Sequence, residues 1–317
     1  MYRLSAKIEI SSDKDWQLDK VTEVEITRDT EQLTDTCKIT LPKKIRWNGL
    51  YEVPLKRGDA VKVWLGYNDN LSLAFVGYIR DVGLKTPVTL SCEDEMFQLK
   101  QQETVKKTYT AVTIEQLLKD QGLTSINVLG EQALGAYRVT ANTVAALLSQ
   151  LKDNGIRSFF RYENDTPVLY CGVIFERDAD IAQVFATGIN IIDDSNLRQQ
   201  QADNMRLRVR AVSLMPDNSK YKVEVGDDDG ELRTIHTYNK SESELKAWAE
   251  QELERLKQDG LTGSFTTFGH CLIDKLDAIG IKVDDQKKGV YQVRKNVIKY
   301  GTAGFHQEIT LGGKISS

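Results

Sequence analysis

The chain contains few residues of the types that perform chemistry, and they are widely spaced. Its histidines and cysteines are His236, His270, His306, Cys37, Cys92, Cys171 and Cys271. Zinc sites usually pair their ligands at short spacings such as Cys-x-x-Cys, which the sequence lacks. His270 and Cys271 are adjacent, so on a strand their side chains point to opposite faces and do not form a catalytic couple. We therefore expect reduced, unmetallated cysteines, no metal and no cofactor.

Carboxylate pairs, which could supply a general acid and base, occur at Asp193-Asp194 and at Asp227 to Asp229. Both stretches have the composition of turns, where aspartate side chains bond to their own backbone. The sequence contains no Gly-x-Ser-x-Gly, no His-Glu-x-x-His and no glycine-rich phosphate loop. These features together predict that the chain is not an enzyme.

Charge is balanced along the chain. The 42 basic and 46 acidic residues give a net charge of −4, with no basic face of the kind that binds nucleic acid. Two strand faces are nevertheless charged, and they carry the candidate site residues Arg206, Arg208, Arg210, Glu23 and Glu25. We expect these residues to line a channel or a contact surface, and the sequence leaves the choice between the two roles open.

No part of the sequence has the pattern of a membrane segment. Residues 1–27 contain no basic region followed by an apolar core, and no window approaches 18 apolar residues. We expect a chain that is made in the cytoplasm without a signal peptide.

Strands are the elements predicted to position these side chains. Residues 289–313 alternate in the manner of a β-hairpin that turns at 301–304, and short alternating runs fill the first hundred residues. Strands at such short intervals, without helices between them, are typical of an antiparallel barrel or sandwich.

Helices are predicted at three places. A capping box at Thr113 to Gln116 opens a short helix, and a second helix begins at Asn142 or Thr143 and stops at Gly155. A hairpin over 158–171 follows. A second capping box, Ser241 to Glu244, opens the third helix, whose apolar stripe is expected to face the core. The stripe consists of Leu245, Trp248, Ala249, Leu253 and Leu256.

The order of strands in residues 55–99 recurs near the end of the chain. Lys275-Leu276-Asp277-Ala278 takes the place of Gly58-Asp59-Ala60, residues 289–293 stand for 74–78, and 307–311 stand for 88–92. The shared feature is an acidic turn, a strand and a hairpin rather than sequence identity. We interpret it as an internal repeat.

Several stretches resemble one known family. Residues 137–172 read as a strand, a helix that begins with Thr-Val, a glycine and a hairpin that ends in Leu-Tyr-Cys-Gly. Together with 75–99 and 289–311, they are similar to phage tail baseplate hub proteins, the late control protein D and Mu-type tail hub family, related to the hub part of contractile injection system spikes. One departure is Lys295-Asn296-Val297, where the family commonly has a histidine, so no role of that histidine is carried over.

The resemblance implies a mainly β fold with two similar antiparallel β-barrel-like, tail-tube-like domains that flank a small α+β region. The expected domains are 1–102, the insert 103–180, and 181–317 with a helix at about 241–259. At 317 residues, the length fits about two domains.

The resemblance also implies a structural role in the baseplate of a contractile tail of a virus, prophage or related injection machine. There, a homotrimer with pseudo-six-fold symmetry joins the six-fold tail tube to a separate three-fold spike, and other baseplate proteins are further partners. Specific nucleic-acid binding is not implied, but DNA can pass through the channel. A cell-wall glycan-binding module, with Tyr137, Tyr162 and Tyr170 as stacking groups, or a wall hydrolase remains the alternative.

Overall fold

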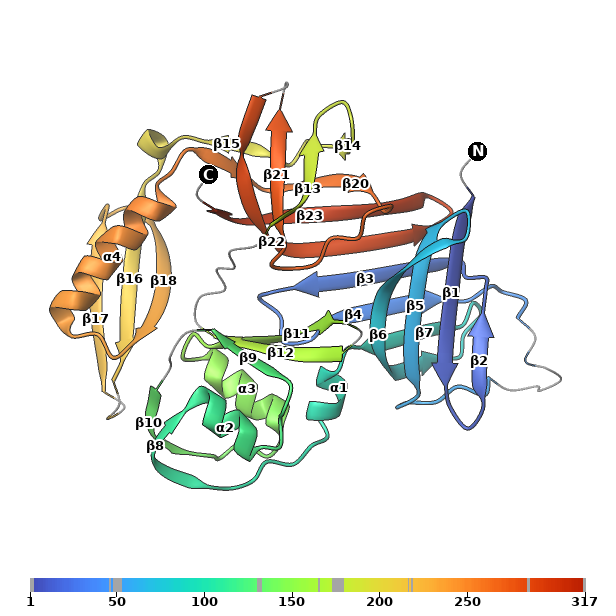
Figure 1. The fold of residues 1–317 in the computed structure, drawn as a ribbon, viewed down its shortest axis with the longest axis horizontal. Coiled ribbons are helices and arrows are strands. Elements are labelled where there is room, and N and C mark those ends of the chain that lie inside the picture. Colours follow the sequence, from blue (N-terminus) through green and yellow to red (C-terminus); the bar gives the residue numbers. More distant parts are fainter. Residues whose placement is uncertain are drawn as a thin grey trace. The chain divides into compact units, whose positions relative to one another are not determined.

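The computed structural model is built mainly from strands (Figure 1). It describes residues 3–45, 47, 53–129, 133–164, 166–172, 180–215, 217, 219–283 and 286–315, without the side chains of 286–288. The chain forms two compact units, which are described separately: unit 1 comprises Met1–Gln98, Arg177–Leu197 and Gly263–Ser317, and unit 2 comprises Leu99–Glu176 and Arg198–Thr262. Among the described residues, no helix is long and apolar enough to cross a membrane.

Unit 1 is organised around one 13-stranded sheet. Its strands are β1 (Leu4–Ser11), β2 (Asp15–Leu18), β3 (Glu23–Asp29), β4 (Thr36–Thr40), β5 (Ala60–Tyr67), β6 (Asn70–Gly83), β7 (Thr89–Glu93), β13 (Ile181–Ala186), β14 (Ile191–Asp193), β20 (Ser264–Phe268), β21 (Ala278–Val283), β22 (Gln286–Gly301) and β23 (Gly304–Ile315). The short helix α1 (Met96–Leu99) follows β7. The main path runs β14-β20-β23-β22-β3-β4-β7-β6-β5-β1-β2, and β21 pairs with β22 and β13.

The predicted repeat is present in unit 1 as two three-stranded meanders, β5-β6-β7 and β21-β22-β23. Each begins with the same acidic turn. The amide of Lys56 donates to Asp59 Oδ2 at 2.8 Å, and the amide of Asp274 donates to Asp277 Oδ2 at 2.7 Å. In both turns the aspartate accepts from the amide three residues before it, as the third residue of a capping box does.

The backbone around the two turns also matches. The amides of Gly58 and Leu276 donate to the carbonyls of Ile79 and Val293, both at 2.8 Å. Gly58 and Leu276 both have positive φ, +93° and +68°. Because a residue other than glycine is strained in this region, the second turn keeps its shape against the preference of leucine.

Two β-bulges recur at matching positions. One residue is inserted between Ile79 and Asp81 of β6 in its ladder with β7, and one between Val293 and Lys295 of β22 in its ladder with β23. The bulged residue is an arginine in both strands, Arg80 in the first and Arg294 in the second. A bulge is a defined local geometry, so its recurrence supports a common architecture.

A second pair of matching bulges shows that the predicted match between residues 289–293 and 74–78 is wrong by one residue. The register shifts after Val63 in the β5–β6 ladder and after Ile281 in the β21–β22 ladder. Residues 289–293 therefore match 75–79 and not 74–78. A one-residue shift exchanges the two faces of a strand, and bulges on both sides of this stretch interrupt the alternation that would have fixed the register.

The repeated order extends beyond the meanders. β4 and then β3 follow β7 in the sheet, and β20 and then β14 follow β23. The two sets join where β22 pairs with β3, which opposes Ile298 to Ile26. Both side chains are fully buried. The core beneath this junction contains apolar residues of both repeats, among them Val24, Phe75 and Phe305.

The mainly β fold class is confirmed, and most ladders are antiparallel as expected. The ladders β13–β21, β16–β18 and β9–β12 are parallel. β13 and β21 are separated by about ninety residues of chain, a crossover long enough to return the second strand in the same direction.

A closed barrel is not found among the described residues. The sheet of unit 1 is an open path whose ends are the short strands β2 and β14. Short edge strands offer few unpaired backbone N–H and C=O groups, which limits the length of any ladder that a further strand could form at either end of the sheet.

Unit 2 contains an α+β part and a helix-covered sheet. The first consists of β8 (Thr108–Thr113), α2 (Ile114–Asp120), β9 (Ile126–Leu129), β10 (Ala133–Arg138), α3 (Val144–Lys152), β11 (Arg157–Glu163) and β12 (Thr166–Gly172). The second consists of the sheet strands β16 (Leu207–Leu214), β17 (Lys220–Gly226) and β18 (Glu231–Tyr238) with helix α4 (Glu242–Leu256). Next to it in the sequence are the two-stranded sheet of β15 (Arg198–Gln200) and β19 (Gly260–Thr262) and the 3-10 helix η1 (Ala202–Asn204). The three predicted helices and the hairpin over 158–171 are confirmed as α2, α3, α4 and β11–β12.

Helix α4 packs its apolar stripe on the sheet β17-β16-β18, as predicted. Leu245 and Ala249 are fully buried against Val209 and Ala211 of β16. The domain boundaries at 102 and 180 stay a prediction, because the two contact units divide the chain by a different criterion.

Replacing Ser241 with alanine is expected to destabilise α4. The Ser241 side chain accepts from the amide of Glu244, and the Glu244 carboxylate accepts from the amide of Ser241 at 2.8 Å. Loss of such a cap lowers helix stability by about 1 kcal/mol. Faster amide hydrogen exchange in α4 would show it, whereas Ser243→Ala should leave exchange nearly unchanged, and equal effects of the two variants would contradict the prediction.

Candidate functional site

Glu23 and Glu25 lie on the outer face of the sheet in unit 1. Both side chains are exposed, while Val24 and Ile26 between them are fully buried. Glu25 is directly opposite Lys299 of β22 on one side and Lys38 of β4 on the other. Directly opposed side chains on one face have Cβ atoms about 5 Å apart, so opposite charges attract there.

The row through Glu25 continues over five neighbouring strands. Lys299 opposes His306 of β23, and Lys38 opposes Ser91 of β7. The row therefore reads His306, Lys299, Glu25, Lys38, Ser91, in which one acidic side chain lies between two lysines. This polar sheet face spans strands of both repeats without a break in the ladder.

Arg206, Arg208 and Arg210 lie in unit 2, at β16 and just before it. Arg210 Nε is 2.7 Å from Glu224 Oε1, and Arg208 Nε is 3.7 Å from Glu224 Oε2. Arg206 pairs with Asp229 at 2.6 Å. The hydrogen bond from Arg210 lowers the pKa of Glu224 below its ordinary value. The arginines are therefore partly neutralised by acidic neighbours and form no free basic row.

The structure places the two predicted sets in different units, and it gives the carboxylate pairs local roles. Asp193 Oδ1 accepts from the amide of Ser195, and Asp227 Oδ2 accepts from the amide of Leu207 and from Lys257 Nζ. Across the described ranges, no three His, Cys, Asp or Glu side chains are grouped to hold a metal ion.

Two of the cysteines are cross-strand neighbours. Cys37 of β4 lies opposite Cys92 of β7, and both are buried free thiols. Burial raises the pKa of both, that of Cys92 to about 12. Since the thiolate is the reactive form, these thiols are poor nucleophiles and poor metal ligands at neutral pH.

The tyrosines considered as glycan platforms are buried or half-buried. Tyr170 is buried and stacks on Phe159 with ring centroids 6.1 Å apart, and its hydroxyl bonds to Glu163. Tyr137 and Tyr162 are half-buried. A sugar stacks on an exposed ring face, so the geometry gives no support to the glycan-binding alternative.

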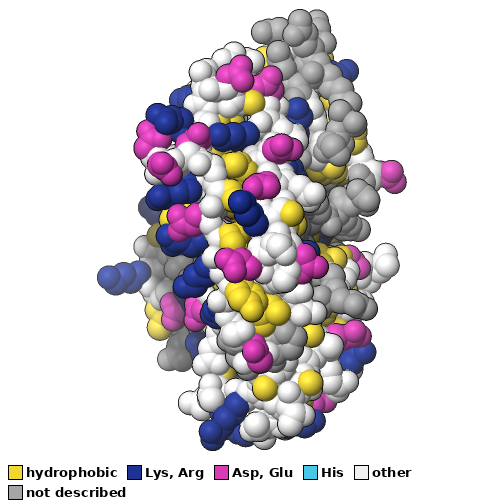
Figure 2. All heavy atoms as spheres, turned by 90° about the vertical axis from the view of Figure 1, so that its left-hand side faces the viewer, with side chains coloured by type: hydrophobic (Ala, Val, Ile, Leu, Met, Phe, Trp, Pro, Cys, Tyr) yellow, Lys and Arg dark blue, Asp and Glu magenta, His cyan; other side chains and the backbone are white. Residues whose placement is uncertain are grey.

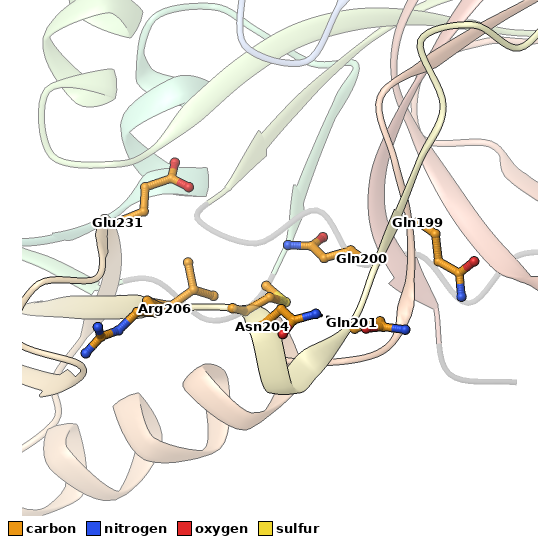
Figure 3. A pocket seen from close by; sticks show the side chains of 8 residues that line it. Gln199, Gln200, Gln201, Asn204, Arg206 and Glu231 are labelled. Atoms are coloured by element: carbon orange, nitrogen blue, oxygen red, sulfur yellow. Dashed lines mark hydrogen bonds between the residues drawn. The ribbon is translucent and has the colours of Figure 1, made fainter.

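A hollow of about 460 Å³ lies in unit 2 between β15 and the start of β16 (Figure 3). Its lining is rich in amides, with Gln199, Gln200, Gln201 and Asn204, and includes Arg206 and Glu231. Asn204 Nδ2 donates to Gln201 Oε1 at 2.9 Å. Of these residues, the sequence predicted a role only for Arg206, because amide side chains carry no recognisable motif.

Figure 2 shows Lys and Arg side chains interspersed with Asp and Glu on one face of the molecule. No single sign of charge dominates that face. This mixture agrees with the balanced composition and lacks the basic stripe of a nucleic-acid reader.

Comparisons with known proteins find similar structures, whereas the sequence comparisons find no match. No family model matches the sequence, and no curated protein sequence matches it. The 43 kDa tail protein of prophage MuSo2 from Shewanella oneidensis is similar over 98% of both chains, with a TM-score of 0.62 and 15% identity. A tail protein from Neisseria meningitidis is similar over 98% of this chain and 96% of its own, with a TM-score of 0.64 and 14% identity.

A third similar structure is the E. coli c3393 protein, a component of the type VI secretion system described as structurally similar to the bacteriophage T4 tail proteins gp27 and gp5. It matches 93% of this chain and 74% of its own, with a TM-score of 0.56 and 10% identity. The chain thus has the fold of phage tail proteins over nearly its whole length. The resemblance noted in the sequence is confirmed at the level of the fold.

Proposed function

We propose that the protein is a structural hub of the baseplate in a contractile phage tail or a related injection machine. The observation that carries this proposal is the shared fold with two tail proteins over 98% of this chain. Among the described residues, the carboxylate pairs and the buried cysteines serve local structure, which supports a structural role.

In this proposal three copies form a ring with a central channel. The internal repeat gives each chain two similar strand sets, so three chains supply six similar positions around the axis. Such a ring matches a six-fold tail tube on one side and a separate three-fold spike on the other. A closed cyclic assembly repeats one contact around its axis. In this ring, half of the contacts between neighbouring strand sets would already be made within the chains, and the other half would form between chains.

The polar sheet face with Glu23 and Glu25 is the proposed channel lining. It crosses strands of both repeats, so each of the three chains would contribute one such face to the ring. It carries charges of both signs, so it holds no strong field of one sign and a polyanion such as DNA could pass without being bound. Arg206, Arg208 and Arg210 lie outside the repeat and are assigned instead to contacts with other baseplate proteins.

The test is to image the assembled tail particle and count the copies of this chain at the junction of tube and spike. Three copies are expected, together with co-purification of the tube and spike proteins from the virion tail. A monomer in dilute solution is compatible with assembly on the particle. Any other copy number at this junction would rule out the ring.

A further inference from the structure

Another hollow of unit 2 lies at the two-stranded sheet of β8 and β10, which are neighbours in Figure 1. It has a volume of about 400 Å³ and is found where β8 begins and β10 ends. Its lining is mostly basic and polar, and consists of Lys106, Lys107, Thr108, Arg138, Val139 and Thr140. Ligand pockets commonly have volumes of about 300–1,000 Å³, so the hollow has room for a small molecule. The proposed hub function gives it no role.

The ladder between β8 and β10 brings the two halves of this lining together. Thr108 lies directly opposite Arg138, and the amide of Val139 donates to the carbonyl of Lys107 at 3.0 Å. Because 107 and 139 form the hydrogen-bonded pair, Thr108 and Arg138 form a non-hydrogen-bonded pair, whose Cα atoms lie about 4.5 Å apart and whose side chains are closer. Both side chains are exposed. A hydroxyl and a guanidinium are therefore neighbours at the hollow.

The guanidinium of Arg138 is available to a ligand. Among the described residues, no carboxylate and no other acceptor lies within hydrogen-bonding distance of it. An arginine has five N–H donors in a planar fork, and this fork matches the oxygens of an anionic group in a bidentate contact. Arg138 can therefore supply several hydrogen bonds to one bound anion.

Lys106 adds a positive charge that is fixed in position. Its Nζ donates to the carbonyl of Thr140 at 3.0 Å, to the carbonyl of Ala141 and to Oδ1 of Asn142 at 3.2 Å. These acceptors are neutral, so they hold the ammonium group without cancelling its charge. Because they occupy its three N–H donors, Lys106 attracts an anion through its charge, whereas Arg138 supplies the hydrogen bonds.

The third cation of the lining is neutralised by a carboxylate. Lys107 Nζ lies 2.6 Å from Asp120 Oδ2, which also accepts from the hydroxyl of Tyr109 at 2.7 Å. The hydrogen bond from Lys107, together with those from Tyr109 and Gln116, lowers the pKa of Asp120 to about 2. Among the described residues, two of the three cations of the lining are therefore left without a carboxylate partner.

We propose that this hollow binds a phosphate monoester, with the phosphate held by Arg138 and Lys106 and its polar carrier, such as a sugar, in the remaining space. A phosphate monoester carries a charge of about −1.5 to −2 at pH 7, which matches two uncompensated cations better than the single charge of a carboxylate does. The hydroxyls of Thr108 and Thr140 can donate to further phosphate oxygens. Val139 is buried, so the surface that the hollow offers to the carrier is polar. The site lies within one chain and does not depend on the proposed ring.

The test titrates the purified full chain with glucose 6-phosphate, inorganic phosphate and glucose, and follows the amide NMR signals of residues 106–108 and 138–140. Glucose 6-phosphate is expected to shift these signals. Inorganic phosphate should shift them with weaker affinity, because it lacks the carrier, and glucose should leave them unchanged, because it lacks the charge.

Arg138→Gln should reduce the affinity for glucose 6-phosphate by about tenfold or more, since it removes both a charge and the donor fork. The matched control is Lys119→Gln, which removes the same charge from unit 2 at an exposed lysine of α2 that pairs with Glu115 at 2.5 Å. It should bind like the parent chain. Thr108→Val keeps the β-branched shape of the strand residue, and it should lower the affinity a few-fold through the lost hydroxyl. Circular dichroism should show folded protein in each case.

Equal affinities of Arg138→Gln and Lys119→Gln for glucose 6-phosphate would overturn the site, as would the absence of binding to the parent chain. Equal affinities of the parent chain for phosphate and glucose 6-phosphate would overturn the place given to the carrier. An aspartate-rich peptide that shifts the same signals at lower concentration than glucose 6-phosphate would assign the hollow to a partner protein and overturn the phosphate ligand. Each of these results leaves the hub function standing, because that function is tested by the copy number on the tail particle.

Discussion

Replacing Lys275 with methionine is expected to destabilise the protein by about 3–5 kcal/mol, because it leaves buried carboxylates without their cation. Lys275 is fully buried, and its Nζ lies 2.7 Å from Asp35 Oδ1. Asp35 in turn contacts Asp94, whose Oδ2 accepts from the amide of Asp35 at 3.0 Å. One buried cation therefore faces two buried carboxyl groups.

The deficit of the variant should depend on pH. Burial raises the pKa of Asp35, and burial together with the charge of Asp35 raises the pKa of Asp94 to about 7. A carboxyl whose pKa is raised on folding contributes stability that is fully present below its unfolded value near 4, and this contribution is lost as pH rises through the folded value. Lys275 offsets that loss, so the deficit of Lys275→Met should grow from pH 5 to pH 8.

The measurement is urea-induced unfolding of both proteins at the two pH values. Lys56→Met is the matched control, because Lys56 pairs with Asp13 on the surface, where the lysine side chain is 58% exposed. It should leave the unfolding midpoint nearly unchanged. A Lys275→Met deficit that is equally large at both pH values would show that the two carboxyl groups are not the cause.

The local elements of this fold could be predicted from the sequence because their signals are local. The capping box at Ser241 and the stripe from Leu245 to Leu256 lie within one helix, and the last hairpin is defined by its own alternation and turn. The acidic turns at Asp59 and Asp277 were also found, since each is complete within four residues.

The pairing of distant strands could not be predicted in the same way. Alternation shows which side chains face the core, but it does not choose a partner, and β22 pairs with β3 across more than 260 residues of chain. The parallel direction of β13 and the bulges at Arg80 and Arg294 are likewise consequences of packing.

The candidate site shows the same division. The outward direction of Glu23 and Glu25 follows from alternation, whereas the lysines opposite Glu25 come from β4 and β22. The neutralisation of Arg210 by Glu224 depends on a ladder whose register no sequence motif specifies. The burial of Lys275 was unexpected, because a lysine in an acidic turn is ordinarily solvated.

Replacing Gln307 with leucine is expected to destabilise the protein by about 3 kcal/mol or more, since each buried backbone group left without a partner costs about 1–3 kcal/mol. Gln307 is fully buried on β23. Its Oε1 accepts from the amide of Ile273 at 3.0 Å, and its Nε2 donates to the carbonyls of Phe268 and Cys271 at 3.1 and 2.6 Å. One side chain thus fixes the connection from β20 to the second acidic turn.

Gln292 on β22 provides the matched control, because the Nε2 of this half-buried glutamine is itself buried and has no hydrogen-bond partner among the described residues. Gln292→Leu should therefore be neutral or mildly stabilising, although it makes the same chemical change as Gln307→Leu. The free energies of unfolding of the two variants, measured by urea titration, separate the two cases. Equal effects at positions 292 and 307 would mean that burial of any glutamine amide, rather than its bonds to the 268–273 backbone, determines the cost.

The Gln307 amide also holds the turn that places Lys275 against Asp35. The Gln307→Leu variant should therefore weaken the ion pair between Lys275 and Asp35. The combined effect of Gln307→Leu and Lys275→Met on the free energy of unfolding should then be smaller than the sum of the two single effects.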